Sequence, residues 1–353
     1  MSTVLTRMAR PLIFGAIASL FLMTAAPLMA QDRVVIQQPG GSRFTITGYV
    51  EDYTGRELIL KVRPNVRARH FPRAEIVEVT TEYTPRHEEA RKLLAAGKAD
   101  AANAEFTAAL PKEDRPWVRR EILAGQVRCS LWSGDYVTAM SRFSSIVQSD
   151  PETFHYGLVP LNWTDEVPAG RLRSEATRWM ELSSTPLSRL VGASWLLTDA
   201  ELGADAEKTL QRLAREADIA IQRRAQMQLW RVRLRGEVLV DPDEILRWHK
   251  AVEAYPTELR SGVYFVIGRA WQKRHEYERA ARAYLWLPLV YDSDRWLSSR
   301  ACYEAAVSLE KAGDPIQATN LYSEVVFRYG DTPYGPVAEK AWNALQGEKS
   351  AAP

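Results

Sequence analysis

Apolar residues recur at helical spacing along most of the chain, from residue 85 to about residue 345. In residues 205–234 the apolar positions form one stripe, made up of Leu210, Leu213, Ile221, Ala225 and Leu229. Asp218 interrupts this stripe, which predicts two helices joined by a short break. We therefore expect a mainly α-helical protein.

Residues 31–84 follow a different pattern, in which apolar and polar residues alternate. Phe44 and Ile46 alternate with polar neighbours, and residues 74–83, AEIVEVTTEY, predict a further strand. Glycine pairs and Thr-Gly steps cut the run into short pieces. The pattern predicts a small β-barrel of four or five strands, separated by Pro85 from the first helix.

The helical region contains an internal repeat. Residues 133–151, SGDYVTAMSRFSSIVQSDP, place Gly134 at a turn, Ala139 five positions later and Phe143 nine positions later, before Pro151. The same offsets recur around three other turns. The repeat is defined by Gly97, Ala102, Phe106, Gly134, Tyr136, Ala139, Phe143, Pro151, Tyr264, Gly268, Trp271, Tyr277, Ala280, Tyr284, Gly313, Ala318 and Tyr322.

The offsets have a physical explanation in a hairpin of two antiparallel helices. Glycine permits the tight turn, although His275 stands at the turn of one copy. A small residue on each helix lets the two axes approach closely, and the aromatic residue fills the space toward the next hairpin. One hairpin cannot bury its apolar face alone, so neighbouring hairpins must stack.

This pattern resembles the tetratricopeptide repeat (TPR) family, whose period is about 34 residues. The resemblance covers residues 85–156 and 226–345, and it implies a right-handed α-solenoid that ends in a capping helix and a disordered tail at 346–353. Residues 157–225 lack the TPR pattern and resemble HEAT-type helical hairpins. Residues 48–60, GYVEDYTGRELIL, resemble the strand–turn–strand of bacterial SH3-like or Sm-like barrels.

The first 30 residues have the pattern of a secretory signal peptide. Arg7 and Arg10 precede an apolar run at 11–23, and small residues lead to Ala30. We expect an exported, soluble protein, periplasmic or secreted, with no later segment spanning a membrane. An uncleaved anchor is the alternative interpretation.

The net charge and the reactive residues argue against several classes of function. Without residues 1–30 the 46 basic residues fall to 44 and equal the 44 acidic ones, which argues against a nucleic-acid partner. Cys129 and Cys302 fall within helical patterns and are expected in the core. The five histidines have no metal-binding spacing, and no nucleotide-binding or hydrolase motif occurs. We predict no cofactor, no metal and no enzymatic activity.

The TPR resemblance implies binding of a protein or peptide along a concave groove lined by the first helix of each hairpin. Arg128, Ser130, Gln272 and Glu304 are the candidate groove residues. Arg67 and Arg69 are expected on one strand face, where they form either a basic patch for an acidic partner or a solvated surface.

Two other functions fit parts of the sequence. The first is binding of cell-wall or envelope glycans through the barrel and the tryptophans expected to be exposed, Trp163 and Trp296. The second is a glycan-processing enzyme, which would need a catalytic domain for which the chain has no room.

Overall fold

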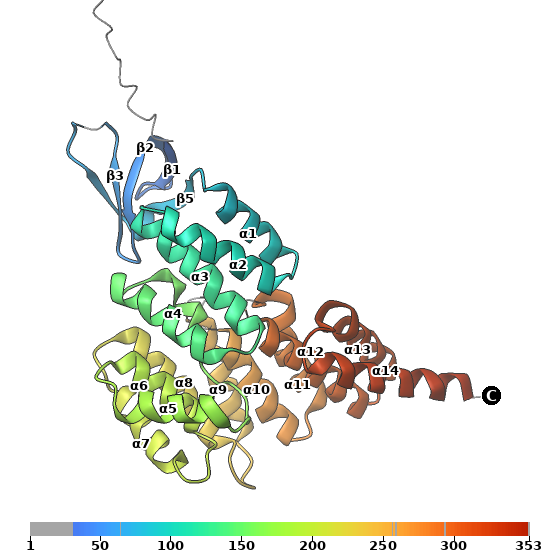
Figure 1. Cartoon of the computed structure of the whole chain (residues 1–353). Helices are drawn as coiled ribbons and strands as arrows, with labels where there is room; N and C mark the ends of the chain where they lie inside the picture. The colour runs from blue at the N-terminus through green and yellow to red at the C-terminus, as the bar shows by residue number, and fades with distance from the viewer. Residues whose placement is uncertain (1–30, 64, 256, 258–259, 293, 352–353) are drawn as a thin grey trace, which may run out of the picture.

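The computed structural model describes residues 31–351 except 64, 256, 258–259 and 293 (Figure 1). The predicted signal peptide, residues 1–30, lies outside the described residues. As predicted, the fold is mainly α-helical, with a small N-terminal β-sheet at one end. In the part of the chain that is described, no helix is both long and apolar enough to cross a membrane.

The N-terminal sheet has five antiparallel strands in the order β4-β3-β2-β1-β5. The strands are β1 (Asp32–Gln37), β2 (Arg43–Tyr53), β3 (Glu57–Lys61), β4 (Arg69–Pro72) and β5 (Ile76–Thr80). The short 3-10 helix η1 (Arg73–Glu75) joins the two edge strands, β4 and β5, which do not pair with each other.

The sheet is therefore open, and the predicted closed barrel is wrong. Its apolar face shares a core with the first three helices, and α3 packs on β2, so closure is not needed to bury it. Val50 and Leu58 of the sheet share one hydrophobic core with Phe106 and Trp117, and the indole of Trp117 donates a hydrogen bond to the carbonyl of Val50 at 3.2 Å.

Fourteen α-helices follow within the described residues. They are α1 (Pro85–Ala95), α2 (Ala99–Ala109), α3 (Pro116–Trp132), α4 (Tyr136–Ser149), α5 (Gly170–Glu181), α6 (Pro186–Leu196), α7 (Gly203–Leu213), α8 (Ile219–Arg233), α9 (Pro242–Glu253), α10 (Ser261–Lys273), α11 (Tyr277–Val290), α12 (Arg295–Lys311), α13 (Pro315–Tyr329) and α14 (Tyr334–Ala351). Most consecutive helices pack against each other. The last helix continues to Ala351, past the end expected at residue 345, because residues 346–351 contain good helix formers and no proline.

The four repeat turns share one backbone conformation. Gly97, Gly134 and Gly313 have φ values of 78°, 73° and 84°, and His275 has 61°. All four lie in the left-handed region that glycine enters without a steric penalty. They join α1 to α2, α3 to α4, α10 to α11 and α12 to α13.

The small and aromatic positions of the repeat are buried at these hairpins. The residues five positions after each turn, Ala102, Ala139, Ala280 and Ala318, are fully buried. The aromatic residues nine positions after it are also buried, and two of them make the same polar contact. The hydroxyl of Tyr284 donates to Gln272 at 3.0 Å, and that of Tyr322 donates to Glu310 at 2.8 Å. Each acceptor lies three residues before its turn.

The chain returns on itself, so that α12 contacts α3. The ring of Trp296, in the first turn of α12, lies 2.9 Å from where a side chain on Gly134 would begin. Figure 1 shows α10–α12 beside the lower end of α3 and α4, and α14 at the far end of the molecule.

Candidate functional site

A stretch without helix or strand crosses the inner side of the helices. We call residues 159–169 the crossing segment; it links the 3-10 helix η3 (Phe154–Leu158) to α5. The backbone N–H of Asn162 donates to the hydroxyl of Ser194 on α6 at 2.9 Å. The ring of Trp163 packs directly on Gly262 of α10, where a Cβ atom would lie 2.1 Å from the ring. Only glycine permits this approach.

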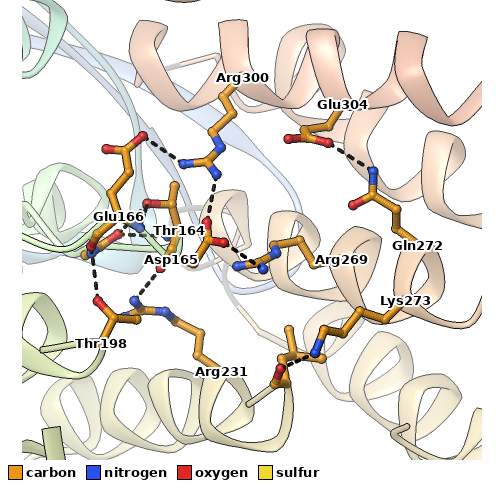
Figure 2. A network of polar contacts seen from close by, with 12 residues as sticks. Thr164, Asp165, Glu166, Thr198, Arg231, Arg269, Gln272, Lys273, Arg300 and Glu304 are labelled. Carbon is orange, nitrogen blue, oxygen red and sulfur yellow. Dashed lines mark hydrogen bonds and ion pairs between the residues drawn. The ribbon is translucent and has the colours of Figure 1, made fainter. Parts of the chain in front are cut away.

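Acidic groups of the crossing segment meet arginines on α10 and α12 (Figure 2). Asp165 accepts hydrogen bonds from Arg269 at 3.0 Å and from Arg300 at 2.7 Å. Arg300 also donates to Glu166 at 2.8 Å. Partial burial would raise the pKa of Asp165, but the charges of Arg269 and Arg300 outweigh this effect and hold that pKa below its usual value.

A buried arginine of α8 holds the backbone of the same segment. Arg231 is 6% exposed and donates hydrogen bonds to the carbonyls of Thr164 and Ser194 and to the side chain of Gln228. Burial lowers the pKa of Arg231 to about 9. All of its hydrogen-bond partners among the described residues are neutral oxygens, so Arg231 contributes hydrogen bonds rather than an ion pair.

Two of the predicted groove residues are paired with each other. Gln272 of α10 donates to Glu304 of α12 at 3.0 Å, so these side chains bond to each other (Figure 2). Gln272 also accepts a hydrogen bond from Tyr284. Both residues are half-buried. Their polar groups are therefore occupied within the helical packing.

Ser130 does not line a groove, in contrast to the prediction. It is 5% exposed, and its hydroxyl accepts a hydrogen bond from Arg142 of α4 at 2.7 Å. The helical pattern alone could not show this, because Ser130 faces the partner helix of its own hairpin.

The basic residues of the sheet region also differ from the prediction. Arg69 is the first residue of β4, whereas Arg67 lies in the loop before it, so the two do not share a strand face. Both are exposed. The guanidinium of Arg69 lies over the ring of Phe71 at 5.0 Å.

The two tryptophans expected to be exposed are half-buried. Trp163 packs on Gly262 and Trp296 packs on Gly134, as described above. Trp286 of α11 is instead 40% exposed, and its ring stacks on Tyr264 at 5.3 Å. The sequence around these two residues does not predict their burial, because Trp163 packs on a distant helix and Trp296, in the first turn of α12, packs on the turn between α3 and α4.

An open groove of about 560 Å³ lies beside α3, and we call it the α3 groove. Its lining comes from the residues just before α1, from α1, α2, α3 and η3, and from the loop before α12. It includes Tyr83, His87, Arg91, Leu94, Phe106, Glu121, Arg128, Trp132, His155 and Asp292. A smaller cavity of about 250 Å³ shares Arg128, His155 and Asp292 with it. Of the groove residues predicted from the sequence, only Arg128 lines this space.

The charge of Arg128 is not matched by a close partner. Its side chain is exposed and makes no hydrogen bond or ion pair with any residue that the structure describes. Glu121 accepts a hydrogen bond from Tyr83 at 2.8 Å, and Asp292 forms an ion pair with Arg328 at 3.1 Å. The two nearby acids are thus engaged with other groups.

Two histidines of the groove have unpartnered nitrogens. Nδ1 of His87 and Nε2 of His155 are buried and find no hydrogen-bond partner among the described residues. Burial lowers the pKa of His87 to about 4 and that of His155 to about 3. Both imidazoles are neutral at pH 7. Sequence reasoning missed them because it tested histidines only for metal-binding spacing.

The remaining candidate chemistry lies in the core. Cys129 and Cys302 are buried, as predicted, and their thiols are free. Burial raises the pKa of Cys129 to about 11 and that of Cys302 to about 12. No three His, Cys, Asp or Glu residues within the described ranges lie close enough to hold a metal ion.

The described residues form a mainly helical protein with an N-terminal antiparallel sheet and an open groove beside α3. Comparison of the chain with protein-family models, with curated proteins and with solved structures found no match.

Proposed function

We propose that this chain is an exported, non-enzymatic scaffold that binds a protein or peptide of the cell envelope in the α3 groove. The observation that carries the proposal is the exposed Arg128, which has no partner among the described residues and lies in an open groove with apolar and aromatic walls. Extended peptides bind in such grooves through their side-chain charges and apolar groups. The pattern of residues 1–30 supports export.

The helical part fits a TPR-type right-handed α-solenoid. Four turns with positive φ, buried alanines after each turn, and the matching contacts of Tyr284 and Tyr322 support this assignment. In such a solenoid the first helices of the hairpins line the concave side, and α3 is a first helix. The open sheet would then act as an N-terminal cap, since it shares its core with α1–α3.

A catalytic role has little support within this groove. The two thiols are buried away from it and their pKa values are raised, so neither supplies a thiolate at neutral pH. The neutral histidines lack a neighbouring nucleophile hydroxyl among the groove residues named above.

Glycan binding is the second candidate, and it now rests on Trp286. This ring is partly exposed and backed by Tyr264, an arrangement on which a sugar ring could stack. Trp286 is not among the residues that line the α3 groove, so the two functions predict different effects of groove mutations.

Affinity capture from envelope extract tests the proposed function. C-terminally tagged full-length chain would be compared with Arg128→Glu and with Arg247→Glu, an exposed arginine of α9 outside the groove. We expect one or a few proteins to be enriched by the wild type and the Arg247 variant and lost with Arg128→Glu. Equal capture by all three baits, or sedimentation with purified cell wall that depends on Trp286, would contradict it.

A further inference from the structure

Two arginines occupy the same position in two different hairpins. Arg128 lies six residues before the turn residue Gly134, and Arg269 lies six residues before the turn residue His275. Both turns have positive φ and both arginines belong to the first helix of their hairpin, α3 and α10. The repeat geometry thus gives the two side chains equivalent places on their helices.

The two arginines differ in whether a carboxylate of the same chain is bound to them. Arg269 holds the carboxylate of Asp165, which the crossing segment presents in a stretch without helix or strand. Two residues earlier in that segment, Trp163 packs against α10. The protein itself therefore shows how an acidic segment without helix or strand, with an apolar anchor, binds to a first helix.

Arg128 has no such segment within the described part of the chain. The crossing segment passes over α8, α10 and α12, while the α3 groove remains open. The other cation of the groove, Arg91, already donates to Glu88 at 3.3 Å and lies over the ring of Tyr83. Glu121 and Asp292 bond to Tyr83 and Arg328. Arg128 is therefore the cation lining this groove that has no partner among the described residues, and it is available to bind one negative charge.

We propose that Arg128 recognises a side-chain carboxylate of an extended, acidic peptide segment, in the way that Arg269 recognises Asp165. This proposal rests on the proposed function and names the chemistry of the partner. Leu94 and the half-buried Trp132 line the same groove and would contact an apolar residue near the acid.

The charge balance of the groove favours a carboxylate over a doubly charged phosphate. Each of the two acids that line the groove would repel a dianion, and only one cation there is without a partner. A planar carboxylate also matches the guanidinium, which presents two parallel N–H donors.

Selection from a displayed library of random linear dodecapeptides tests this inference on the purified full-length chain. We expect enriched peptides to carry Asp or Glu at a fixed distance from an aromatic or large apolar residue. One enriched peptide, labelled with fluorescein, would then be titrated by fluorescence polarisation. Arg128→Ala should weaken its binding about 10-fold or more, which corresponds to about 1.4 kcal/mol.

Three controls separate recognition from structure. Arg247→Ala removes an exposed arginine outside the groove and should leave the affinity unchanged. Arg128→Lys keeps the charge and should retain part of the affinity. Replacing the peptide's acid by its amide should weaken binding to the wild type about as much as Arg128→Ala does, and should have no effect on the Arg128→Ala variant.

The outcomes distinguish this inference from the proposed function. Peptides that bind in the groove but need no acid, or that bind Arg128→Ala normally, would overturn the carboxylate assignment and leave peptide binding intact. Failure to enrich any peptide, together with no protein captured from envelope extract, would overturn both.

Discussion

His87 should make the stability of this protein fall in mildly acidic solution. Its side chain is 2% exposed, lies 4.3 Å from the ring of Tyr83 and 5.7 Å from that of Phe106, and leaves Nδ1 without a described partner. Burial is the main cause that lowers its pKa to about 4, and the charges of Arg91 and Arg115 add to it. Glu113 opposes the shift only in part.

The sign of this pH effect follows from the pKa of His87 in the unfolded and in the folded chain. In the unfolded chain His87 has its ordinary pKa of 6.5, so between about pH 6.5 and pH 4 the unfolded state binds more protons than the folded state. The stability associated with the neutral, buried His87 is fully present above pH 6.5, and it is lost as the pH falls through this window. For one group with these values the free energy of unfolding drops by about 2 kcal/mol between pH 7.5 and pH 5.

Urea unfolding followed by circular dichroism at pH 7.5 and at pH 5 measures this loss. The matched variant is His87→Phe, which keeps an aromatic ring beside Tyr83 and Phe106 but binds no proton. Wild type should lose about 2 kcal/mol more than the variant on acidification. Burial raises the pKa of Asp294 to about 6 and lowers that of His155, but both groups titrate in both proteins and their effects cancel in the comparison.

Equal losses in wild type and His87→Phe would refute the reasoning, because they would mean that His87 is solvated and titrates alike in both states. If His87→Phe does not fold, His87→Leu provides the same comparison with a smaller apolar side chain.

Three further predictions concern the turns, the crossing segment and the thiols. Gly97→Ala should lower the free energy of unfolding by about 1 kcal/mol through its positive φ alone, since no atom lies near the position of the added side chain. Gly134→Ala should lower it clearly more, because a tryptophan ring must also move. Thermal unfolding of the two variants checks this order. Asp165→Asn should reduce the free energy of unfolding by about 1 kcal/mol in low salt and by less in 0.5 M salt, measured by urea titration, because it removes the charge shared by two partly exposed arginines. Cys129 and Cys302 should react with a thiol reagent at pH 8 far more slowly in the native protein than in denaturant, and equal rates would show that they are accessible.

Local features of the fold could be predicted from the sequence because they depend on residues close together in the chain. The spacing of apolar residues predicted that most of the chain is helical, and the residues at the repeat offsets predicted tight turns. His275 illustrates the strength of this pattern, since it adopts φ 61° at a position where the other copies have glycine. Arg128 was predicted to line a groove from its place on a first helix, and it lines the α3 groove.

Long-range features could not be predicted in this way. The closed barrel was wrong because the sequence of the sheet does not say which surface will cover its apolar face. Gln272 and Glu304 were assigned to a partner surface, yet they bond to each other across α10 and α12.

By itself the sequence determined the helices, their turns and the repeated hairpin, since backbone preference and apolar periodicity act over a few neighbouring residues. Only the tertiary structure decided which inner surface is filled and which stays open. Asp165 and Arg300 are 135 residues apart in the chain, and they meet because the fold brings α12 to the crossing segment. The same packing leaves Arg128 without a partner among the described residues, because the burial and pairing of a charge depend on all the elements packed around it.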